Sequence, residues 1–236
     1  MLVKTRGIVL NFIRYRETSI IARIYTEQLG LQTYIVNSVR KKGPGTRIAL
    51  FQPLTLLEMV VYKSGSGGIT RISEYKCAHP FHSLHYDIRK SSVALFLSEI
   101  ISASVKEEEE NPPLFKFLYQ SIVAFDNLET GFENFHLAFL MQLAHYLGFG
   151  AHNATEITNQ VAFAPPTGHV SQPSVMHFQM FEGMLDELME NPQEALVPNG
   201  RVRKELLNIL IRFYQLHVDR LGEIKSLHVL SDVLSD

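Results

Sequence analysis

The sequence from Thr18 to Arg40 reads TSIIARIYTEQLGLQTYIVNSVR and contains two runs of alternating side chains separated by Gly30. Alternation with a period of two places successive side chains on opposite faces of a strand, as a half-buried sheet requires. In the first run, Ile24 lies on one face and Arg23 on the other. The second run alternates in the same way. The stretch therefore predicts two strands joined by a turn at Gly30.

Three further runs of the same texture surround this pair within the first 76 residues. Glycine-rich turns punctuate them, and a basic loop, KKGPGT at residues 41–46, separates the third run from the fourth. Five short strands in so few residues are typical of a small closed barrel, and we predict an OB-type barrel. The predicted strands cover residues 3–15, 18–27, 31–39, 50–62 and 69–76.

After residue 85 the apolar period becomes helical. Asp87 is a suitable cap for a first helix, and Pro112-Pro113 accompanies the start of a second. A helix at about 132–147 is apolar almost all round, which indicates a central place in a bundle. No clear period is visible at about 149–173, where we expect a long loop. Further helices are expected at about 174–190, 200–221 and 226–234.

The predicted fold class is α+β, with an N-terminal OB-fold β-barrel over residues 1–80 and an all-α helical domain over residues 81–236. Charge divides at the same place. Residues 1–80 contain 12 Lys and Arg against 4 Asp and Glu, and the remainder contains 10 against 20. A basic region beside an acidic one suggests different partners, and the basic region suits a polyanion. The alternative is that the two regions simply attract each other.

The chain contains one cysteine, Cys77, which excludes an internal disulfide. The N-terminus has no long apolar stretch of the kind found in secretory signals. Apolar runs also fall well short of the roughly 20 residues that span a bilayer. We therefore expect a cytoplasmic protein.

Motifs of several common enzyme classes are missing from the sequence, including GxxxxGK[ST], GxSxG and HExxH. Cys77, His79, His82 and His85 are four potential zinc ligands, but their spacing fits no usual structural site. A solvated linker between domains is the commoner meaning of such a cluster. The Glu107–Glu110 run is expected to be an exposed helix end or loop. We predict no catalytic residue, metal or cofactor.

Basic side chains are concentrated where a nucleic-acid groove on the barrel would need them. Lys and Arg contact phosphates without regard to sequence. Tyr15, Tyr25 and Tyr34 are candidates for stacking on unpaired bases, and Tyr34 is expected to face the same way as Arg23. Exposed charges and half-buried tyrosines are also ordinary in small barrels. The predicted DNA-binding residues are Arg14, Arg16, Arg23, Tyr34, Arg40, Lys41, Lys42, Arg47, Lys63 and Arg71.

Seven short segments each resemble a known family only weakly, but their order and spacing together make the resemblance specific. They are TRGIVL at 5–10, YRETS at 15–19, YTEQLGL at 25–31, VRKKG at 39–43, FQPL at 51–54, LGFG at 147–150 and KSLHVL at 225–230. Together they resemble the bacterial recombination mediator family RecO over nearly the whole chain.

The resemblance implies an OB fold, a helical C-terminal domain and a role in DNA repair without catalysis. Members of the family bind single- and double-stranded DNA, anneal complementary strands and engage the acidic tail of the single-strand-binding protein SSB. With RecR they help load RecA onto SSB-coated DNA, so RecA and RecF are expected only as indirect partners. The resemblance also implies association with the nucleoid, and it makes Arg40-Lys41-Lys42 with its barrel neighbours the DNA surface.

Many family members carry a four-cysteine zinc module after the central helix. The matching stretch here, about 149–176, contains no cysteine, and His152, His169 and His177 are too scattered to replace one. We expect no zinc there, and a loop that is held by its own apolar side chains.

The SSB tail is acidic and ends in apolar residues, so it needs an apolar pocket with a basic edge. The helical region is net acidic, which leaves few residues for that edge. Each candidate is also interpretable as ordinary solvated surface. The candidates are Lys116, Arg201, Arg203 and Lys204.

A non-enzymatic DNA-binding mediator of repair is thus the first hypothesis. The alternative is an adaptor protein whose basic barrel docks an acidic protein partner rather than nucleic acid. An unrecognised nuclease or transferase is a third class, but a nuclease needs clustered carboxylates for metal, and the four acidic residues of the basic region are well separated. Binding of bare oligonucleotide separates the first two.

Overall fold

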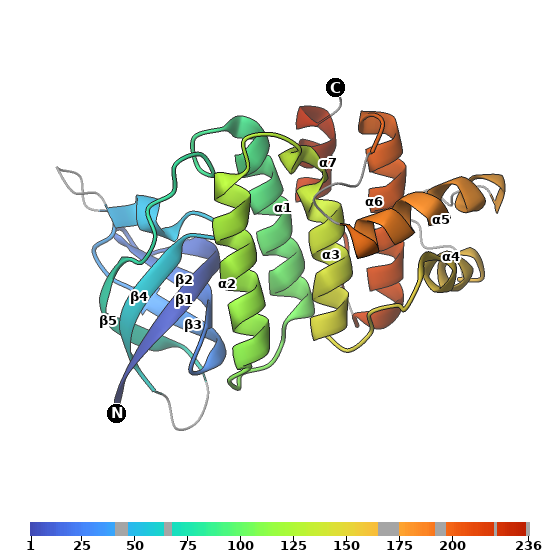
Figure 1. Cartoon of the computed structure of the whole chain (residues 1–236). Helices are drawn as coiled ribbons and strands as arrows, with labels where there is room; N and C mark the ends of the chain where they lie inside the picture. The colour runs from blue at the N-terminus through green and yellow to red at the C-terminus, as the bar shows by residue number, and fades with distance from the viewer. Residues whose placement is uncertain (41–46, 64–67, 165–174, 192–196, 220, 235–236) are drawn as a thin grey trace. The chain divides into compact units, whose positions relative to one another are not determined.

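The chain forms a closed five-stranded barrel followed by helices in a computed structural model (Figure 1). The structure describes residues 1–40, 47–63, 68–164, 175–191, 197–219 and 221–234. Contacts divide the chain into two compact units, the first comprising Met1–Asp87 with Ala94–Asn127, the second Ile88–Val93 with Leu128–Asp236. The first unit thus holds, besides the barrel, most of two helices that follow residue 80.

The barrel consists of strands β1 (Leu2–Tyr15), β2 (Ser19–Thr26), β3 (Gly30–Val36), β4 (Leu56–Tyr62) and β5 (Thr70–Cys77). Their order around the barrel is β1-β2-β3-β5-β4, and only β3 and β5 pair in parallel. The long strand β1 pairs with β4 along its first half and with β2 along its second, which closes the sheet. The predicted OB-type barrel is confirmed.

The fourth strand begins later than the sequence pattern predicts. A short 3-10 helix, η1 (Arg47–Phe51), occupies the start of the predicted run. Leu54 then adopts a positive φ of 63°, and its amide donates to the carbonyl oxygen of Val9 at 2.7 Å. The apolar run that begins at residue 50 therefore belongs partly to a turn and only partly to the strand. Phe51 in this segment is fully buried.

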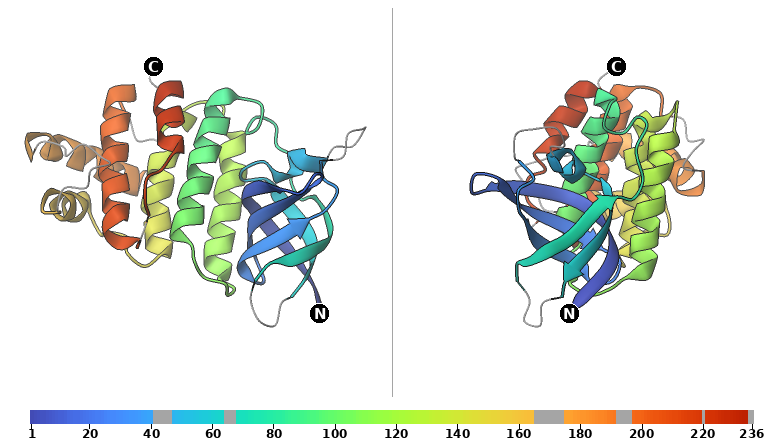
Figure 2. Two further views of the ribbon diagram at one scale, coloured as in Figure 1. Left: turned by 180° about the vertical axis from the view of Figure 1, so that it is seen from behind. Right: turned by 90° about the vertical axis from the view of Figure 1, so that its left-hand side faces the viewer.

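Helices α1 (Ile88–Ser104) and α2 (Pro112–Asn127) follow the barrel, and α2 lies beside it in both views (Figure 1, Figure 2). The ring centroids of Tyr25 on β2 and Phe115 on α2 are 6.1 Å apart. The connection between the helices meets the barrel at Gly30, where the Leu31 amide donates to the Glu107 carbonyl oxygen at 2.9 Å. Gly30 has a φ of 62°, and a Cβ there would lie 2.3 Å from a backbone oxygen of Glu109. Glycine is therefore required at this turn.

The second unit contains η2 (Phe132–Asn134), α3 (Phe135–Tyr146), α4 (Ala154–Ala162), α5 (Val175–Glu190), α6 (Gly200–His217) and α7 (Ser226–Val233). Helix α3 is buried on nearly every side and contacts both α5 and α6, so its predicted central place is confirmed. None of the helices described here combines the length and apolar character needed to cross a membrane.

The predicted loop at about 149–173 is wrong in its first half, where α4 forms. Asn153 caps this helix by accepting from the Glu156 amide at 2.9 Å, and the Glu156 side chain accepts from the His152 amide. A carboxylate oxygen of Asp186 on α5 also accepts from the Ala154 amide at 2.7 Å. Capping and packing therefore stabilise this nine-residue helix, whose buried side is formed by Ala154, Ile157, Thr158 and Val161. Residues 165–174 lie outside the described part of the chain.

The buried carboxylate of Asp126, on α2, binds the backbone of the segment that follows the barrel. Asp126 accepts backbone hydrogen bonds from His82, Ser83 and Leu84 at 2.7–2.9 Å, and Ser83 Oγ donates to it as well. Burial by itself raises the pKa of Asp126, but these hydrogen bonds outweigh it and lower the pKa below the ordinary 3.8. The ionised form is thus the one that the fold stabilises.

Replacing Asp126 by Asn is expected to lower the free energy of unfolding by about 2 kcal/mol at pH 7, since an amide cannot serve all these donors. Because the pKa is depressed in the folded state, the stabilisation is present above the ordinary pKa and is lost as pH falls through the lowered value. Urea denaturation at pH 7 and at pH 3 measures both effects. The exposed control Glu108→Gln should stay within about 0.5 kcal/mol of the unsubstituted protein, and equal losses in both variants would contradict the assignment.

Candidate functional site

Three of the predicted arginines gather at the turn between β1 and β2. Arg14 lies near the end of β1, and Arg16 lies in the turn itself; both are exposed. Arg40 is half-buried and joins them from the segment after β3, because its amide donates to the Thr18 carbonyl oxygen at 3.1 Å and its Nη1 to that of Arg16 at 3.3 Å. We call Arg14, Arg16 and Arg40 the turn cluster.

The backbone of Arg16 is strained. Its φ is 52°, a left-handed conformation that costs a residue with a Cβ about 1 kcal/mol. The guanidinium lies 5.2 Å from the centroid of the Tyr15 ring, which offsets part of that cost.

The other predicted cations lie on different parts of the barrel. Arg47 opens η1, with its guanidinium 5.8 Å from the centroid of the Tyr75 ring. Lys63 is exposed beyond β4, where its amide donates to the Met1 carbonyl oxygen, and Arg71 is exposed on β5 opposite Ile35. Lys41 and Lys42 lie outside the described residues.

Of the predicted DNA-binding residues, Tyr34 is not available to a ligand, and Arg23 is partly engaged in the fold. Tyr34 is fully buried in the barrel core, because the register pairs it with Ala22 and therefore turns it inward. It does not face the same way as Arg23, which pairs with Thr33, and its expected stacking role is wrong. Arg23 is half-buried, and its Nη1 donates to Ser102 Oγ of α1 at 3.0 Å. Burial lowers the pKa of Arg23 and raises that of Tyr34.

Two exposed cations on β1 and β5 are paired with acids. Arg6 forms a two-fold contact with Glu27 at 2.6 and 2.9 Å, and Lys76 lies 2.9 Å from Glu58. The hydrogen bond from Arg6 is the main reason why the pKa of Glu27 is lowered. Arg6 and Lys76 are therefore neutralised by acidic partners, in contrast to the turn cluster.

Cys77 and the three neighbouring histidines do not converge on one point. Cys77 is exposed, His79 packs edge-on against Phe81, and His85 Nε2 lies 3.0 Å from the Pro53 carbonyl oxygen. Within the described residues, no three His, Cys, Asp or Glu side chains form a group that could hold a metal ion.

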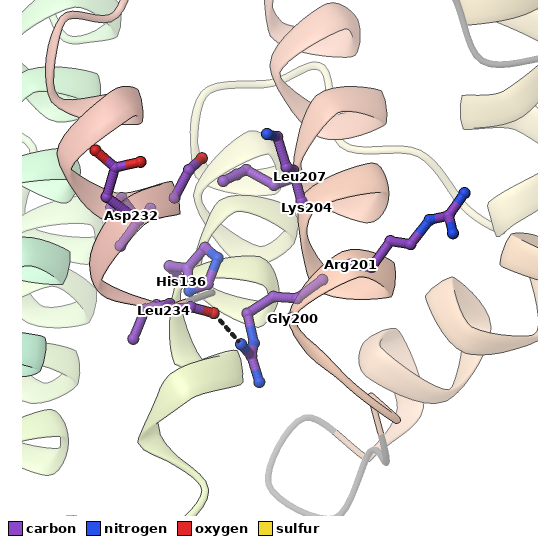
Figure 3. A pocket seen from close by; sticks show the side chains of 10 residues that line it. His136, Gly200, Arg201, Lys204, Leu207, Asp232 and Leu234 are labelled. Carbon is purple, nitrogen blue, oxygen red and sulfur yellow. Dashed lines mark hydrogen bonds between the residues drawn. The ribbon is translucent and has the colours of Figure 1, made fainter. Parts of the chain in front are cut away.

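A pocket of about 280 Å³ opens in the second unit at the start of α6 (Figure 3). Arg201 and Lys204 extend from α6, while Asp232 and Leu234 come from the C-terminal helix and the residue after it. Arg201 points away from α7, so Lys204 is the nearer rim cation. The floor is apolar through Leu207, Leu230 and Leu234.

The third basic residue of this pocket has a structural role. Arg203 is buried, its Nε donates to Asn134 Oδ1 at 3.0 Å, and its Nη1 donates to the Leu234 carbonyl oxygen at 2.9 Å. Burial, and then the nearby Arg203, lower the pKa of His136 to about 3, so this pocket histidine is neutral at pH 7. Lys116 is exposed on α2 and does not line the pocket.

Sequence reasoning missed the pocket residues that lie far from α6 along the chain. His136 and Leu234 reach the pocket only through the packing of α3 and α7 against α6. The tail segment KSLHVL contained the one available signal, since its leucines recur at helical spacing.

A closed barrel of five strands followed by a helical region defines an OB-fold protein with a helical C-terminal part. The family model described as "Recombination protein O N terminal" matches residues 1–81, and "Recombination protein O C terminal" matches residues 85–228. The chain belongs to the RecO family of DNA repair proteins.

Individual relatives agree with this assignment along their whole length. Proteins named DNA repair protein RecO are 36% identical in Flavobacterium psychrophilum over 242 residues and 36% identical in Bacteroides fragilis over 244 residues. A third, from Chlorobium limicola, is 28% identical over 262 residues. Each alignment covers at least 99% of this chain and of the relative.

Proposed function

We propose that this protein is a non-enzymatic recombination mediator that binds single- and double-stranded DNA through its barrel and anneals complementary strands. The observation that supports DNA binding most strongly is the turn cluster. Backbone hydrogen bonds hold Arg40 beside the strained Arg16. None of the three arginines forms an ion pair with an acid in the described part of the chain, although Glu17 is a neighbour in sequence.

Phosphate is the ligand chemistry that suits this cluster. Unpaired guanidinium groups contact phosphate oxygens and release the counterions condensed on nucleic acid, which favours binding without sequence preference. The paired cations Arg6 and Lys76 contribute less, because Glu27 and Glu58 already neutralise them. DNA binding is therefore assigned to the turn end of the barrel.

The variant Arg16→Gly combined with Arg40→Ala is expected to weaken binding of a labelled single-stranded oligonucleotide and to slow annealing. Each lost phosphate contact should reduce the slope of log affinity against log salt by about 0.7. Glycine suits the positive φ at position 16, so stability should change by no more than about 1 kcal/mol. Fluorescence anisotropy across salt concentrations measures the slope.

Lys76→Ala is the matched control, because it removes an exposed cation that is already paired. Its expected effect on the slope is small. An unchanged slope in the double variant, or an equal change in the control, would contradict the assignment. No binding of bare DNA by the unsubstituted protein at low salt would favour the adaptor that docks an acidic protein partner.

We further propose that the acidic tail of SSB docks in the pocket at the start of α6. The apolar floor suits the apolar end of such a peptide, and Lys204 and Arg201 supply a positive rim beside the helix N-terminus. Asp232 on the opposite side opposes this attraction, which sets a modest affinity. RecR, and through it RecA and RecF, are proposed as partners on family membership alone.

A fluorescent acidic peptide that ends in Phe is expected to bind the Arg201→Glu, Lys204→Glu variant about tenfold more weakly than the unsubstituted protein, because two rim charges change sign. Anisotropy titration at low salt measures the difference. Lys116→Glu makes a similar change on α2 and should have little effect. A larger loss in Lys116→Glu than in the pocket variant would place the peptide elsewhere.

A further inference from the structure

The β2 part of the wall on which OB-fold barrels commonly bind nucleic acid is covered here. Such barrels use the face of strands 2 and 3 with the neighbouring loops, and unpaired bases stack there on aromatic side chains. On β2, Tyr25 points outward but is fully buried, with its ring 6.1 Å from Phe115 of α2. Asn11 and Arg23 both donate to Ser102 Oγ of α1 at 3.0 Å. Helices therefore occupy the place of the bases.

Two other tyrosines of the barrel, Tyr15 and Tyr75, each lie close to the guanidinium group of an arginine. Arg16 lies 5.2 Å from the ring centroid of Tyr15, and Arg47 lies 5.8 Å from that of Tyr75. Tyr75 is also held edge-on by Phe51 at 5.2 Å. A guanidinium group thus already lies against each of these two rings.

The sequence of the undescribed barrel segments supplies no further ring. Residues 41–46 read KKGPGT and residues 64–67 read SGSG, so neither contains an aromatic side chain. Within the described first unit, Tyr62 is 49% exposed, but it pairs with Leu2 at the end of β1 opposite to the turn cluster. Tyr86 is exposed in the segment that leads to α1.

From this arrangement we infer that the barrel holds DNA by its phosphates alone, with the bases unstacked and turned away from the protein. The ligand at this site is the phosphodiester backbone, and the inference rests on the proposed DNA binding. A strand held in this way keeps its Watson–Crick edges free to pair with a complementary strand. This arrangement suits both the proposed strand annealing and the proposed binding of duplex DNA.

The test compares a thymine oligonucleotide with an abasic phosphodiester chain of the same length, both end-labelled, by anisotropy across salt concentrations. The two affinities should agree within about twofold, with equal salt slopes, because both ligands present the same phosphates. If bases stack on the protein, the abasic chain should bind about tenfold or more weakly than the thymine oligonucleotide, since stacking on a single ring has an effect of that size. That result would overturn the inference while leaving DNA binding intact.

Variants show which side chains contact each ligand, and they distinguish the proposed DNA binding from the inference that only the phosphates are bound. Arg16→Gly should weaken both ligands by the same factor. Tyr62→Ser and Tyr86→Ser should change neither, and a loss for the thymine ligand alone in one of them would place bases on that ring and overturn the inference. Binding of neither ligand to the unsubstituted protein would instead overturn the proposed DNA binding and the inference together.

Discussion

The packing of two helices on the outer face of β2 is the constraint on which the first unit depends. Tyr25 packs against Phe115, and the guanidinium of Arg6 lies 5.4 and 4.8 Å from the ring centroids of Phe115 and Tyr119. Asp126 fastens the other end of α2 by accepting three backbone amides. These contacts bury the outer face of β2, so a ligand of the barrel must bind elsewhere on the barrel surface.

The rest of the barrel surface has an uneven distribution of charge. The turn cluster lies where β1 ends, whereas the acidic run Glu107–Glu110 is exposed and held by its backbone at Gly30, at the turn between β2 and β3. Elsewhere on the barrel, Arg6 and Lys76 are paired with Glu27 and Glu58. The proposed DNA site is therefore the positively charged turn of the barrel, and the acidic run lies at a different turn.

Much of the fold was predictable, because strand alternation and helical period are local properties of the chain. The side to which Tyr34 points was not, since it follows from the pairing of Tyr34 with Ala22, and a one-residue change of register reverses every side chain. Helix α4 was missed although Asn153 and Glu156 form a capping pair, because its apolar stripe spans only nine residues. At the site, Arg14, Arg16 and Arg40 were each named as DNA-binding residues, but their meeting at one turn was not predicted. The hydrogen bond from Arg23 to Ser102 was not predictable either, because it joins residues 79 positions apart.

Hydrogen exchange of the full chain with and without a single-stranded oligonucleotide tests most directly where the barrel meets DNA. Turn amides exchange readily unless a ligand covers them, so the change is measurable there. The account predicts slower exchange confined to residues 14–18 and 38–40, with no change at residues 21–25 and 32–35. Protection of residues 21–25 without protection of the turn would contradict it, because it would place DNA on the face of β2 that α1 and α2 cover.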